Sequence, residues 1–474
     1  MSDPVIPLCV DLDGTLTPID TLHESLLSVA GRRPATLFRL PVWLTGGKAE
    51  FKRKLAECSS VDFKVLPLRT DLLEWLRAER AAGRTLILAT AADQSIADAV
   101  ANQVGLFSEA IGSDGVTNLS GERKRRALVA RFGEKGFDYV GNDSNDEAVW
   151  KSCRHAIVVG PPKLVVRAER NCHVDRVFSP VQWQLRVWVR ALRLHQWVKN
   201  VLIFLPAVMG HRFLDPVVMS AALRAFIAFG LCASSVYLVN DLLDLNADRS
   251  HPRKRKRPFA AGALSAASGL GLSIALLLSA AALALTINRF FAAVLAGYFI
   301  LTCAYSIRLK RAALVDVITL AGLYTLRIIA GATATLIVPS FWLLAFSMFI
   351  FISLGCVKRY AELNDTKPAD AMTKAHGRGY WKSDLPLLLS LGTSSGYCTI
   401  LVMALYLNSP ESQILYRHSK PLWLMCPLFL YWISRVWLLA VRGQMHDDPV
   451  VFALRDRTSL LVVALAAFTF WVSI

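Results

Sequence analysis

Nine long apolar stretches fill the sequence from Val198 to its last residue. The first is short and contains Pro206. They run roughly through residues 198–210, 217–239, 263–286, 290–307, 313–338, 341–357, 385–407, 422–441 and 459–474. A helix needs about twenty apolar residues to cross a bilayer, where it satisfies its own backbone hydrogen bonds. The sequence therefore predicts an all-α, multi-pass membrane bundle of about nine transmembrane helices over residues 201–474.

The residues before this region have a different composition. The whole chain is 54% hydrophobic and 19% charged, but the apolar runs begin only near Val198, so we expect a soluble domain over residues 1–180. Residues 181–200 are basic and contain Trp183, Trp188 and Trp197, which suits an interfacial helix. The N-terminus has no basic segment followed by an apolar one, so no cleavable signal peptide is expected.

Basic residues are concentrated in alternate loops of the apolar region. They comprise the run 249–257; Arg308, Lys310 and Arg311; Lys358, Arg359, Lys367, Lys374, Arg378 and Lys382; and Arg442, Arg455 and Arg457. Loops rich in Lys and Arg usually stay on the cytoplasmic side. The pattern predicts a protein of the inner (cytoplasmic) membrane whose soluble domain and active sites face the cytoplasm. It also explains the formal net charge of +17 without nucleic acid as a partner.

The stretch Asn240–Gly262 combines three acids with a dense basic run. Asp241, Asp244 and Asp248 recur at i, i+3 and i+7, a spacing that places them on one face of a helix. Carboxylates at this spacing repel one another unless a cation shares them, and oxygen ligands suit Mg²⁺. We therefore expect a site for Mg²⁺ and a diphosphate here, beside Asn240, with outer phosphates held by the basic loop.

Polar residues around later stretches predict a second half-site on the same side of the membrane. Tyr305, Lys310 and Asp316 surround the end of the fourth stretch and the start of the fifth, and Lys358 follows the sixth. Arg327 lies inside the fifth stretch, where a charge is costly and usually tied to function. An internal salt bridge is the alternative for Arg327, and a topology signal is the alternative for Lys358.

Polar groups in the soluble domain follow short apolar strands. In chain order they are Asp11 and Asp13 after the strand 6–10, Thr90 after the strand 85–89, Lys124 at the start of a helix, and Asp143 and Asp146 after the strand 138–140. One carboxylate can attack phosphorus while a second protonates the leaving oxygen. A hydroxyl and an ammonium group can hold the phosphate, and further acids can hold Mg²⁺. The series predicts phosphoryl transfer.

This series resembles the haloacid dehalogenase (HAD) superfamily of phosphatases over about residues 5–165. The resemblance implies a Rossmann-like α/β domain in which Asp11 is the nucleophile, Asp13 is the acid/base, and both contact Mg²⁺. It also implies that Thr90 and Lys124 bind the phosphate. A helical cap over about residues 20–80 would select the substrate.

One position departs from the HAD pattern. Asn142 follows Gly141, where the family usually has an aspartate. Either Asp143 or Asp146 must then complete the metal site, and both alternatives stay open. A degenerate domain kept as a scaffold is the alternative to an active phosphatase.

The spacing from Asn240 to Asp248, with the second half-site, resembles the UbiA superfamily of intramembrane prenyltransferases over about residues 190–474. That resemblance implies a helical bundle with a pocket open to lipid, in which Asp241, Asp244 and Asp316 hold Mg²⁺. The runs at 193–200, 248–258, 358–363 and 446–449 are similar to a narrower branch, the decaprenyl-phosphate phosphoribosyltransferases.

In that branch the resemblance implies 5-phosphoribose 1-diphosphate (PRPP) as the donor and a polyprenyl phosphate as the acceptor. The dense basic run suits a donor with a distant 5-phosphate. The candidate phosphate contacts are Lys199, Arg253, Lys254, Arg257 and Arg327. The fused phosphatase would then remove the 5-phosphate from the lipid product.

Two other functions fit parts of the sequence. The first is an aromatic-acceptor prenyltransferase that uses a prenyl diphosphate, with a separate phosphatase activity. The second is a non-catalytic transporter or scaffold, which the acids at the mouth of the apolar region disfavour because transport sites lie near the midplane. The sequence is also compatible with a homo-oligomer.

Overall fold

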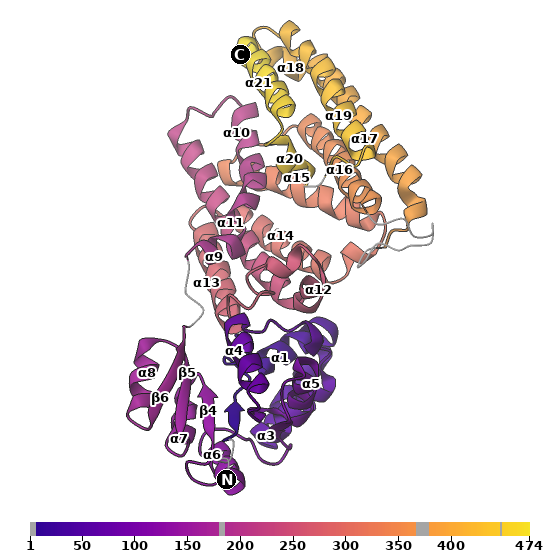
Figure 1. Ribbon diagram of the computed structural model, residues 1–474. Coiled ribbons are helices and arrows are strands. Elements are labelled where there is room, and N and C mark those ends of the chain that lie inside the picture. The colour runs from indigo at the N-terminus through magenta and orange to yellow at the C-terminus, as the bar shows by residue number, and fades with distance from the viewer. Residues whose placement is uncertain (1–5, 180–184, 366–378, 446–447) are drawn as a thin grey trace. The chain divides into compact units, whose positions relative to one another are not determined.

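The computed structural model describes residues 6–179, 185–365, 379–445 and 448–474 (Figure 1). The chain forms two compact units. The first combines Met1–Leu192 with Tyr237–Ser273, and the second combines Arg193–Val236 with Ile274–Ile474. The segment that carries the predicted aspartate cluster therefore belongs to the same unit as the soluble domain.

A six-stranded parallel sheet forms the centre of the first unit, with the strand order β3-β2-β1-β4-β5-β6. The strands are β1 (Leu8–Val10), β2 (Leu86–Asp93), β3 (Glu109–Ser113), β4 (Asp138–Gly141), β5 (His155–Val159) and β6 (His173–Phe178). The accompanying helices are α4 (Thr70–Ala81), α5 (Gln94–Val104), α6 (Glu122–Phe132), α7 (Glu147–Trp150) and α8 (Pro162–Glu169), with the turn η3 (Ser144–Asp146). The predicted Rossmann-like α/β fold is confirmed.

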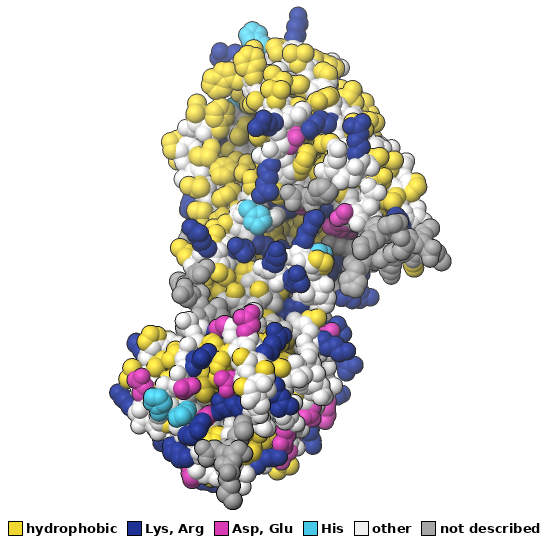
Figure 2. Space-filling model, in the orientation of Figure 1, with side chains coloured by type: hydrophobic (Ala, Val, Ile, Leu, Met, Phe, Trp, Pro, Cys, Tyr) yellow, Lys and Arg dark blue, Asp and Glu magenta, His cyan; other side chains and the backbone are white. Residues whose placement is uncertain are grey.

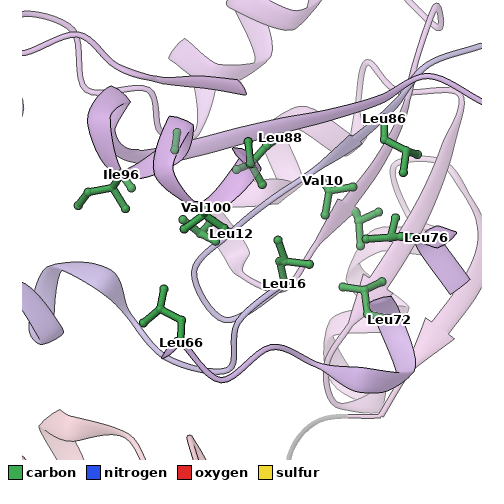
Figure 3. Close-up of a cluster of buried hydrophobic side chains, with 14 of the residues drawn as sticks. Val10, Leu12, Leu16, Leu66, Leu72, Leu76, Leu86, Leu88, Ile96 and Val100 are labelled. Atoms are coloured by element: carbon green, nitrogen blue, oxygen red, sulfur yellow. The ribbon is translucent and has the colours of Figure 1, made fainter. Parts of the chain in front are cut away.

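Buried aliphatic side chains hold this sheet to its helices. Figure 3 shows one cluster, in which Val10 of β1 and Leu88 of β2 meet Leu72 of α4 and Val100 of α5. All four side chains are at most 1% exposed. Because successive residues of a strand point to opposite faces, Cys9 and Ala89 belong to a second cluster on the other face. Both faces of the sheet are therefore covered.

A helical insertion lies between β1 and β2, within the range where the sequence predicted a cap, and we call it the cap. It contains α1 (Thr21–Arg32), η1 (Pro34–Arg39), α2 (Leu40–Thr45), α3 (Lys48–Cys58) and η2 (Phe63–Val65). Asp20 caps α1, since its side chain accepts hydrogen bonds from the backbone of Leu22 and His23. Val29 of α1 packs against Phe51 and Leu55 of α3 in a small core of its own.

Helices make up most of the remaining residues that the structure describes. They are α9 (Leu185–Leu192), η4 (Leu194–Phe204), α10 (Leu205–Met209), α11 (Pro216–Leu243), α12 (Leu245–Ser250), η5 (Lys254–Lys256), α13 (Ala266–Leu285), α14 (Arg289–Ile307), η6 (Leu309–Arg311), α15 (Val315–Thr335), α16 (Phe341–Asn364), η7 (Lys382–Asp384), α17 (Leu385–Leu407), α18 (Pro410–Leu415), η8 (Lys420–Leu424), α19 (Met425–Val441), α20 (Pro449–Ala453) and α21 (Arg457–Ser473). On the face seen in Figure 2, the upper part of the bundle is largely hydrophobic, whereas the α/β domain mixes charged and apolar side chains.

Seven helices in the described part of the chain are long and apolar enough to cross a membrane. The prediction of about nine spans is therefore not confirmed. The first predicted stretch is divided into the 3₁₀ segment η4 and the short helix α10, which has Pro206 in its first turn. The last predicted stretch is α21, an apolar helix of 17 residues. The segment predicted as one interfacial helix over residues 181–200 is divided between α9 and the start of η4, which contains Trp197, and Trp183 lies outside the described residues.

Candidate functional sites

Three predicted HAD residues meet at the carboxyl ends of the central strands. Lys124 donates hydrogen bonds of 2.8 Å to Oδ1 of Asp11 and to the hydroxyl of Tyr139. Its Nζ also lies 3.7 Å from Oδ1 of Asp146. Lys124 is 3% exposed, so the ammonium group neutralises two carboxylates in a nearly dry environment. The ion pair holds the carboxylate of Asp11 in one orientation.

Burial changes the acidity of the two predicted catalytic carboxyls. Desolvation raises the pKa of Asp11 to about 7, although Lys124 opposes the rise. Desolvation and the nearby charge of Asp20 raise the pKa of Asp13 to about 6, although its hydrogen bond from the Thr21 backbone opposes the rise. A carboxyl with a raised pKa can carry a proton near neutral pH, which is what an acid/base group needs.

Thr90 lies inside a strand rather than after one. The prediction ended this strand at Ala89, but β2 continues to Asp93 and its register with β3 shifts between Ala89 and Asp93. A shift of this kind re-aims side chains locally. Thr90 is fully buried, and its hydroxyl accepts a hydrogen bond of 3.0 Å from the backbone of Ala92.

The structure distinguishes the two candidate acids that follow β4. Asp143 is exposed and caps its own turn by accepting hydrogen bonds from Ser144 and Asn145. Asp146 is 3% exposed and accepts from Tyr139 at 2.7 Å and from the backbone of Asn142 at 2.9 Å. Asp146 therefore shares the buried site with Asp11, whereas Asp143 supports the loop.

Asn142 is a member of this site that the sequence alone did not assign. Its Oδ1 accepts a hydrogen bond of 2.9 Å from Thr15 in the loop after β1. Its side chain lies over Gly14, where a Cβ would come within 2.1 Å of Nδ2. Gly14 also has a φ of +74°, a backbone conformation that favours glycine. The signal was present in the sequence, since Asn142 stands where the HAD pattern has an aspartate.

A cap residue also reaches this site. Lys52 of α3 donates to the carbonyl of Ala91 at 2.6 Å and to Oδ1 of Asn118 at 2.9 Å. Desolvation lowers the pKa of Lys52, and the charges of Asp13 and Asp20 oppose that shift. No sequence motif marked Lys52, because only the folded cap brings α3 to the end of β2.

The predicted aspartate cluster is built at the end of α11. Nη1 of Arg257 lies 3.1 Å from Oδ1 of Asp241 and 2.7 Å from Oδ2 of Asp248. Both carboxylates are 3% exposed, so the guanidinium supplies their positive partner. Arg253 and Lys254 lie on the exposed part of the same loop. We define Asp241, Asp248 and Arg257 as the aspartate–arginine cluster.

The helix that carries these acids is not continuous, contrary to the prediction. α11 ends at Leu243 and α12 begins at Leu245, with Asp244 at the break. Helical hydrogen bonding continues across it, because the backbone N–H of Asp244 donates to Asn240 and that of Asp248 donates to Asp244. Asp241 and Asp248 therefore stay close enough to share Arg257, while Asp244 is half-buried beside them.

Three predicted cations meet in the second unit. Nζ of Lys199 lies 2.8 Å from Oδ2 of Asp448, and Nζ of Lys358 lies 3.0 Å from the same oxygen. Tyr324 donates to the other oxygen at 3.2 Å. Two ammonium groups thus share one carboxylate, and Arg327 lies over the ring of Tyr324 at 5.5 Å. We define Lys199, Lys358 and Asp448 as the lysine–aspartate cluster.

Arg327 is held by neutral oxygens. It donates to Asn200 at 3.0 Å, to the hydroxyl of Tyr298 at 3.1 Å and to the carbonyl of Leu323 at 2.5 Å. The guanidinium also lies over the ring of Phe229, and the side chain is buried. These contacts fix the guanidinium within the second unit, and its role in phosphate binding stays a prediction.

Asp316 is engaged with another residue of the second unit. Arg359 forms an ion pair with it, and the hydroxyl of Tyr305 donates to its Oδ1 at 2.7 Å. Asp316 is fully buried and Arg359 is 1% exposed. Arg359 was noted only as a loop cation in the sequence, and Lys310 lies half-buried in η6. The role of Asp316 as a metal ligand stays a prediction.

The donor sets of two clusters suit a hard divalent cation. Asp241 and Asp248 each bring an oxygen within 3.1 Å of one guanidinium nitrogen, so two carboxylates converge on a single positive point. Asp11 and Asp146 converge on Lys124 in the same way. Within the described ranges, no group of three or more His, Cys, Asp or Glu side chains is arranged to hold a metal ion.

A family model described as the UbiA prenyltransferase family matches residues 202–460, which is more than half of the 474 residues. The chain belongs to the UbiA prenyltransferase family. The UbiA match includes the whole aspartate–arginine cluster and, from the lysine–aspartate cluster, Lys358 and Asp448, whereas Lys199 precedes it; the match begins after the α/β domain.

Three comparisons place this UbiA chain among known proteins. An uncharacterized protein of Sinorhizobium fredii, y4nM, is 40% identical over 473 residues, covering 99% of this chain and 91% of that protein. Decaprenyl-phosphate phosphoribosyltransferase of Mycobacterium tuberculosis is 33% identical over 283 residues, covering 59% of this chain and 90% of that enzyme. A UbiA homolog from Archaeoglobus fulgidus bound to GPP and Mg²⁺ has a TM-score of 0.47 and 17% identity, covering 60% of this chain and 99% of that chain.

Family membership supports some of the sequence predictions and leaves others untested. The predicted UbiA resemblance and an integral membrane location are supported. Five residues of the predicted loops and motifs, Lys367, Lys374, Arg378, His446 and Asp447, lie outside the described residues. The HAD resemblance and the phosphatase activity stay predictions.

Proposed function

We propose that this UbiA protein transfers 5-phosphoribose from PRPP to a polyprenyl phosphate. In this reaction the bond from C1 of the ribose to the diphosphate breaks, and a bond from C1 to an oxygen of the lipid phosphate forms. The 33% identity to a decaprenyl-phosphate phosphoribosyltransferase, over 90% of that enzyme, carries the proposal. Both reaction sites are proposed to face the cytoplasm, on the side of the basic loops.

The clusters suit the charges of these substrates. Asp241, Asp244 and Asp248 are proposed to bind Mg²⁺ with the diphosphate of PRPP, and Asn240 to support them. Arg257 can exchange its carboxylate partners for a phosphate, because its side chain is 30% exposed and lies on a loop. The exposed Arg253 and Lys254 would contact the 5-phosphate. Mg²⁺, when bound, would neutralise the departing diphosphate.

The lysine–aspartate cluster is assigned a role of its own. Lys199 and Lys358 share one carboxylate, so these three groups together carry one net positive charge. Such a cluster stabilises an anion that arrives with the substrates or forms in the reaction. Arg327 and Tyr305 are proposed to assist, with Lys310 as a further phosphate contact.

The α/β domain is proposed to be a phosphatase that removes the 5-phosphate from the lipid product. Asp11 would attack phosphorus, Asp13 would protonate the ribose oxygen that leaves, and water would release phosphate from Asp11. Lys124 and Thr90 would hold the phosphate. Asp11, Asp13 and Asn142 would hold Mg²⁺, and Asp146 would support Asn142 by accepting its backbone hydrogen bond. A second site tethered to the same chain raises the effective concentration of its substrate.

The transferase is tested with purified protein in nanodiscs, PRPP, Mg²⁺ and a polyprenyl phosphate. The expected product in a mass spectrum is polyprenyl-phosphoryl-ribose. The matched control is Asp241→Asn, which should give no ribosylated lipid. If wild type also gives none but alkylates an aromatic acceptor with a prenyl diphosphate, the chain is an aromatic prenyltransferase instead.

The phosphatase is tested in the same assay with Asp11→Asn. This variant should accumulate lipid that still carries the 5-phosphate, because the transferase is intact and the nucleophile is missing. Asp143→Asn is the matched control, since its exposed carboxylate serves only its own turn. If Asp11→Asn gives the wild-type product, the sequential-phosphatase proposal is wrong.

A further inference from the structure

The cap is docked on the loop of the aspartate–arginine cluster. Arg249 donates hydrogen bonds of 2.9 Å to both carboxylate oxygens of Glu24 in α1, and these side chains are 2% and 4% exposed. Arg249 also donates to the carbonyl of Ala260 at 3.1 Å. A two-point pair in a dry environment is directional, and separating it would leave a buried charge. α1 is therefore fixed against the loop after α12.

Contacts on either side of this pair extend the interface. Asn246 of α12 donates to the carbonyl of Ser60 at 3.0 Å. A Cβ on Gly262 would lie 2.7 Å from Cγ of Pro18, so the two backbones pack closely. At Gly31 in the last turn of α1, a Cβ would lie 3.5 Å from the carbonyl oxygen of Leu243. The end of α1 therefore lies at the end of α11.

α11 is one of the seven candidate spans, and Leu243 is its last residue. The end of a span marks the boundary between the acyl chains and the headgroups. The chain that leaves α1 at this boundary forms η1 and α2, over residues 34–45. This segment therefore begins beside the end of a candidate span.

The surface of this segment is unusual for a soluble domain. Phe38, Val42 and Leu44 are 87%, 68% and 55% exposed. The other side of the segment packs on the small core of the cap, through Leu37, Leu40 and Trp43. One face is thus anchored in the cap while the opposite face presents large apolar side chains.

The charged residues within this segment and directly beside it are all basic. Residues 31–48 contain Arg32, Arg33, Arg39 and Lys48 and no acid. All four side chains belong to exposed residues. Apolar side chains flanked by cations bind a membrane interface that contains anionic lipid.

We propose that residues 32–48 of the cap form a membrane anchor. Phe38, Val42 and Leu44 insert among the acyl chains, and the three arginines contact anionic headgroups. In terms of the proposed function, the anchor holds the phosphatase site beside a phosphate that is linked to a membrane lipid. The partner is the lipid surface itself, whichever substrate the enzyme uses.

The anchor is tested on the full chain by photocrosslinking in nanodiscs. Benzoylphenylalanine replaces Phe38 or, as the matched control, Val116, which is 85% exposed in the α/β domain. At least about tenfold more lipid adduct is expected at position 38 than at position 116. Equal adducts at the two positions overturn the proposal, and so does an adduct at position 38 that is mainly a second copy of this chain.

The arginines are tested by varying the headgroups. The adduct at position 38 should increase severalfold when phosphatidylglycerol is added to phosphatidylcholine, and high salt should remove the increase. Arg32→Gln, Arg33→Gln and Arg39→Gln together should also remove it. An increase that survives these changes overturns the role of the arginines. These readouts need no catalysis, so failure of the proposed function does not affect them.

A functional measurement links the anchor to the phosphatase. Phe38→Ser with Val42→Ser should raise KM for the phosphorylated lipid severalfold and leave hydrolysis of a soluble phosphate ester unchanged. Val116→Ser is the control. Equal losses on both substrates would mean that the substitutions damage the cap. If wild type hydrolyses neither substrate, the phosphatase proposal fails while the crosslinking result still decides the anchor.

Discussion

Two clusters of the first unit have the same charge pattern but differ in their surroundings. In the α/β domain, Lys124 joins Asp11 and Asp146, and in the loop after α12, Arg257 joins Asp241 and Asp248. Each cluster balances two carboxylates with one basic side chain. They differ in exposure, since the side chain of Lys124 is 4% exposed and that of Arg257 is 30% exposed.

The difference follows from the elements that carry the cations. Lys124 lies on α6, an 11-residue helix whose Leu128 is buried against the sheet, so its ammonium group has little freedom. Arg257 follows the three-residue turn η5 and reaches its partners from the edge of the loop. Lys124 is thus fixed in its site, whereas the partly exposed Arg257 is less restrained and has more freedom to exchange partners. Equal charge patterns can therefore differ in mobility. We call the cluster around Lys124 the fixed site and the cluster around Arg257 the adaptable cluster.

The largest expected effect separates the two reactions. Asp11→Asn should lower phosphatase turnover at least about a thousandfold, because it removes the nucleophile. Asp241→Asn should lower the transferase by a similar factor and leave the phosphatase intact. Both are measured on one preparation, with a soluble phosphate ester and with PRPP plus lipid. Loss of both activities in either variant would contradict two independent sites.

The second effect concerns stability. Lys124→Met should destabilise the protein by about 3–5 kcal/mol, because it leaves two buried carboxylates without their cation. Arg257→Met should cost less than Lys124→Met, because the guanidinium is 30% exposed and water can reach the carboxylates that it leaves. Thermal unfolding in the same detergent, without added metal, gives both shifts. Arg257→Met should instead raise KM for the diphosphate donor, and equal losses of stability would erase the distinction between the clusters.

The strand-end residues were predictable because parallel strands meet at one edge. Asp11 and Asp146 are far apart in sequence, yet each follows an apolar strand, and the paired strands β1 and β4 bring them together. The helix break at Asp244 was not predictable in this way. The spacing of the acids fits a continuous helix, and tertiary packing around α12 decides where that helix ends.

Contacts between distant segments could not be predicted from the sequence. Asp316 was predicted as a metal ligand, but its ion pair depends on Arg359, which lies one helix later. Lys52 had no motif, because its position depends on how the cap folds back on β2. Periodicity reports which face of an element is buried, and it does not report which partner meets that face.

The third effect is a pH dependence of the fixed site. The pKa of Asp11 is raised to about 7, so the folded protein keeps this proton while the unfolded chain releases it near pH 4. Between these values the folded state binds more protons, and its stability falls as pH rises, by at most about 1.4 kcal/mol per pH unit. Relative to Asp11→Asn, metal-free wild type should lose stability from about pH 4 to pH 7 and level off above.

Unfolding curves of both proteins in EDTA at several pH values measure this difference. Asp13 is present in both proteins, so its own raised pKa cancels in the comparison. Arg257→Met, measured against wild type, serves as the control for the adaptable cluster. A difference curve for Asp11→Asn that rises with pH would show that Lys124 outweighs desolvation at Asp11.

The smallest effect tests how the fixed site holds a divalent cation. Asn142 lies over Gly14 with its Oδ1 bonded to Thr15, and Asn142→Asp keeps this shape while adding a negative charge. A carboxylate is a better Mg²⁺ ligand than a carboxamide, so the Mg²⁺ concentration for half-maximal phosphatase activity should fall about tenfold. Asp143→Asn should leave it unchanged, since that side chain is turned toward Ser144. If Asn142→Asp leaves the Mg²⁺ requirement unchanged and Asp143→Asn raises it, the exposed aspartate is the metal ligand.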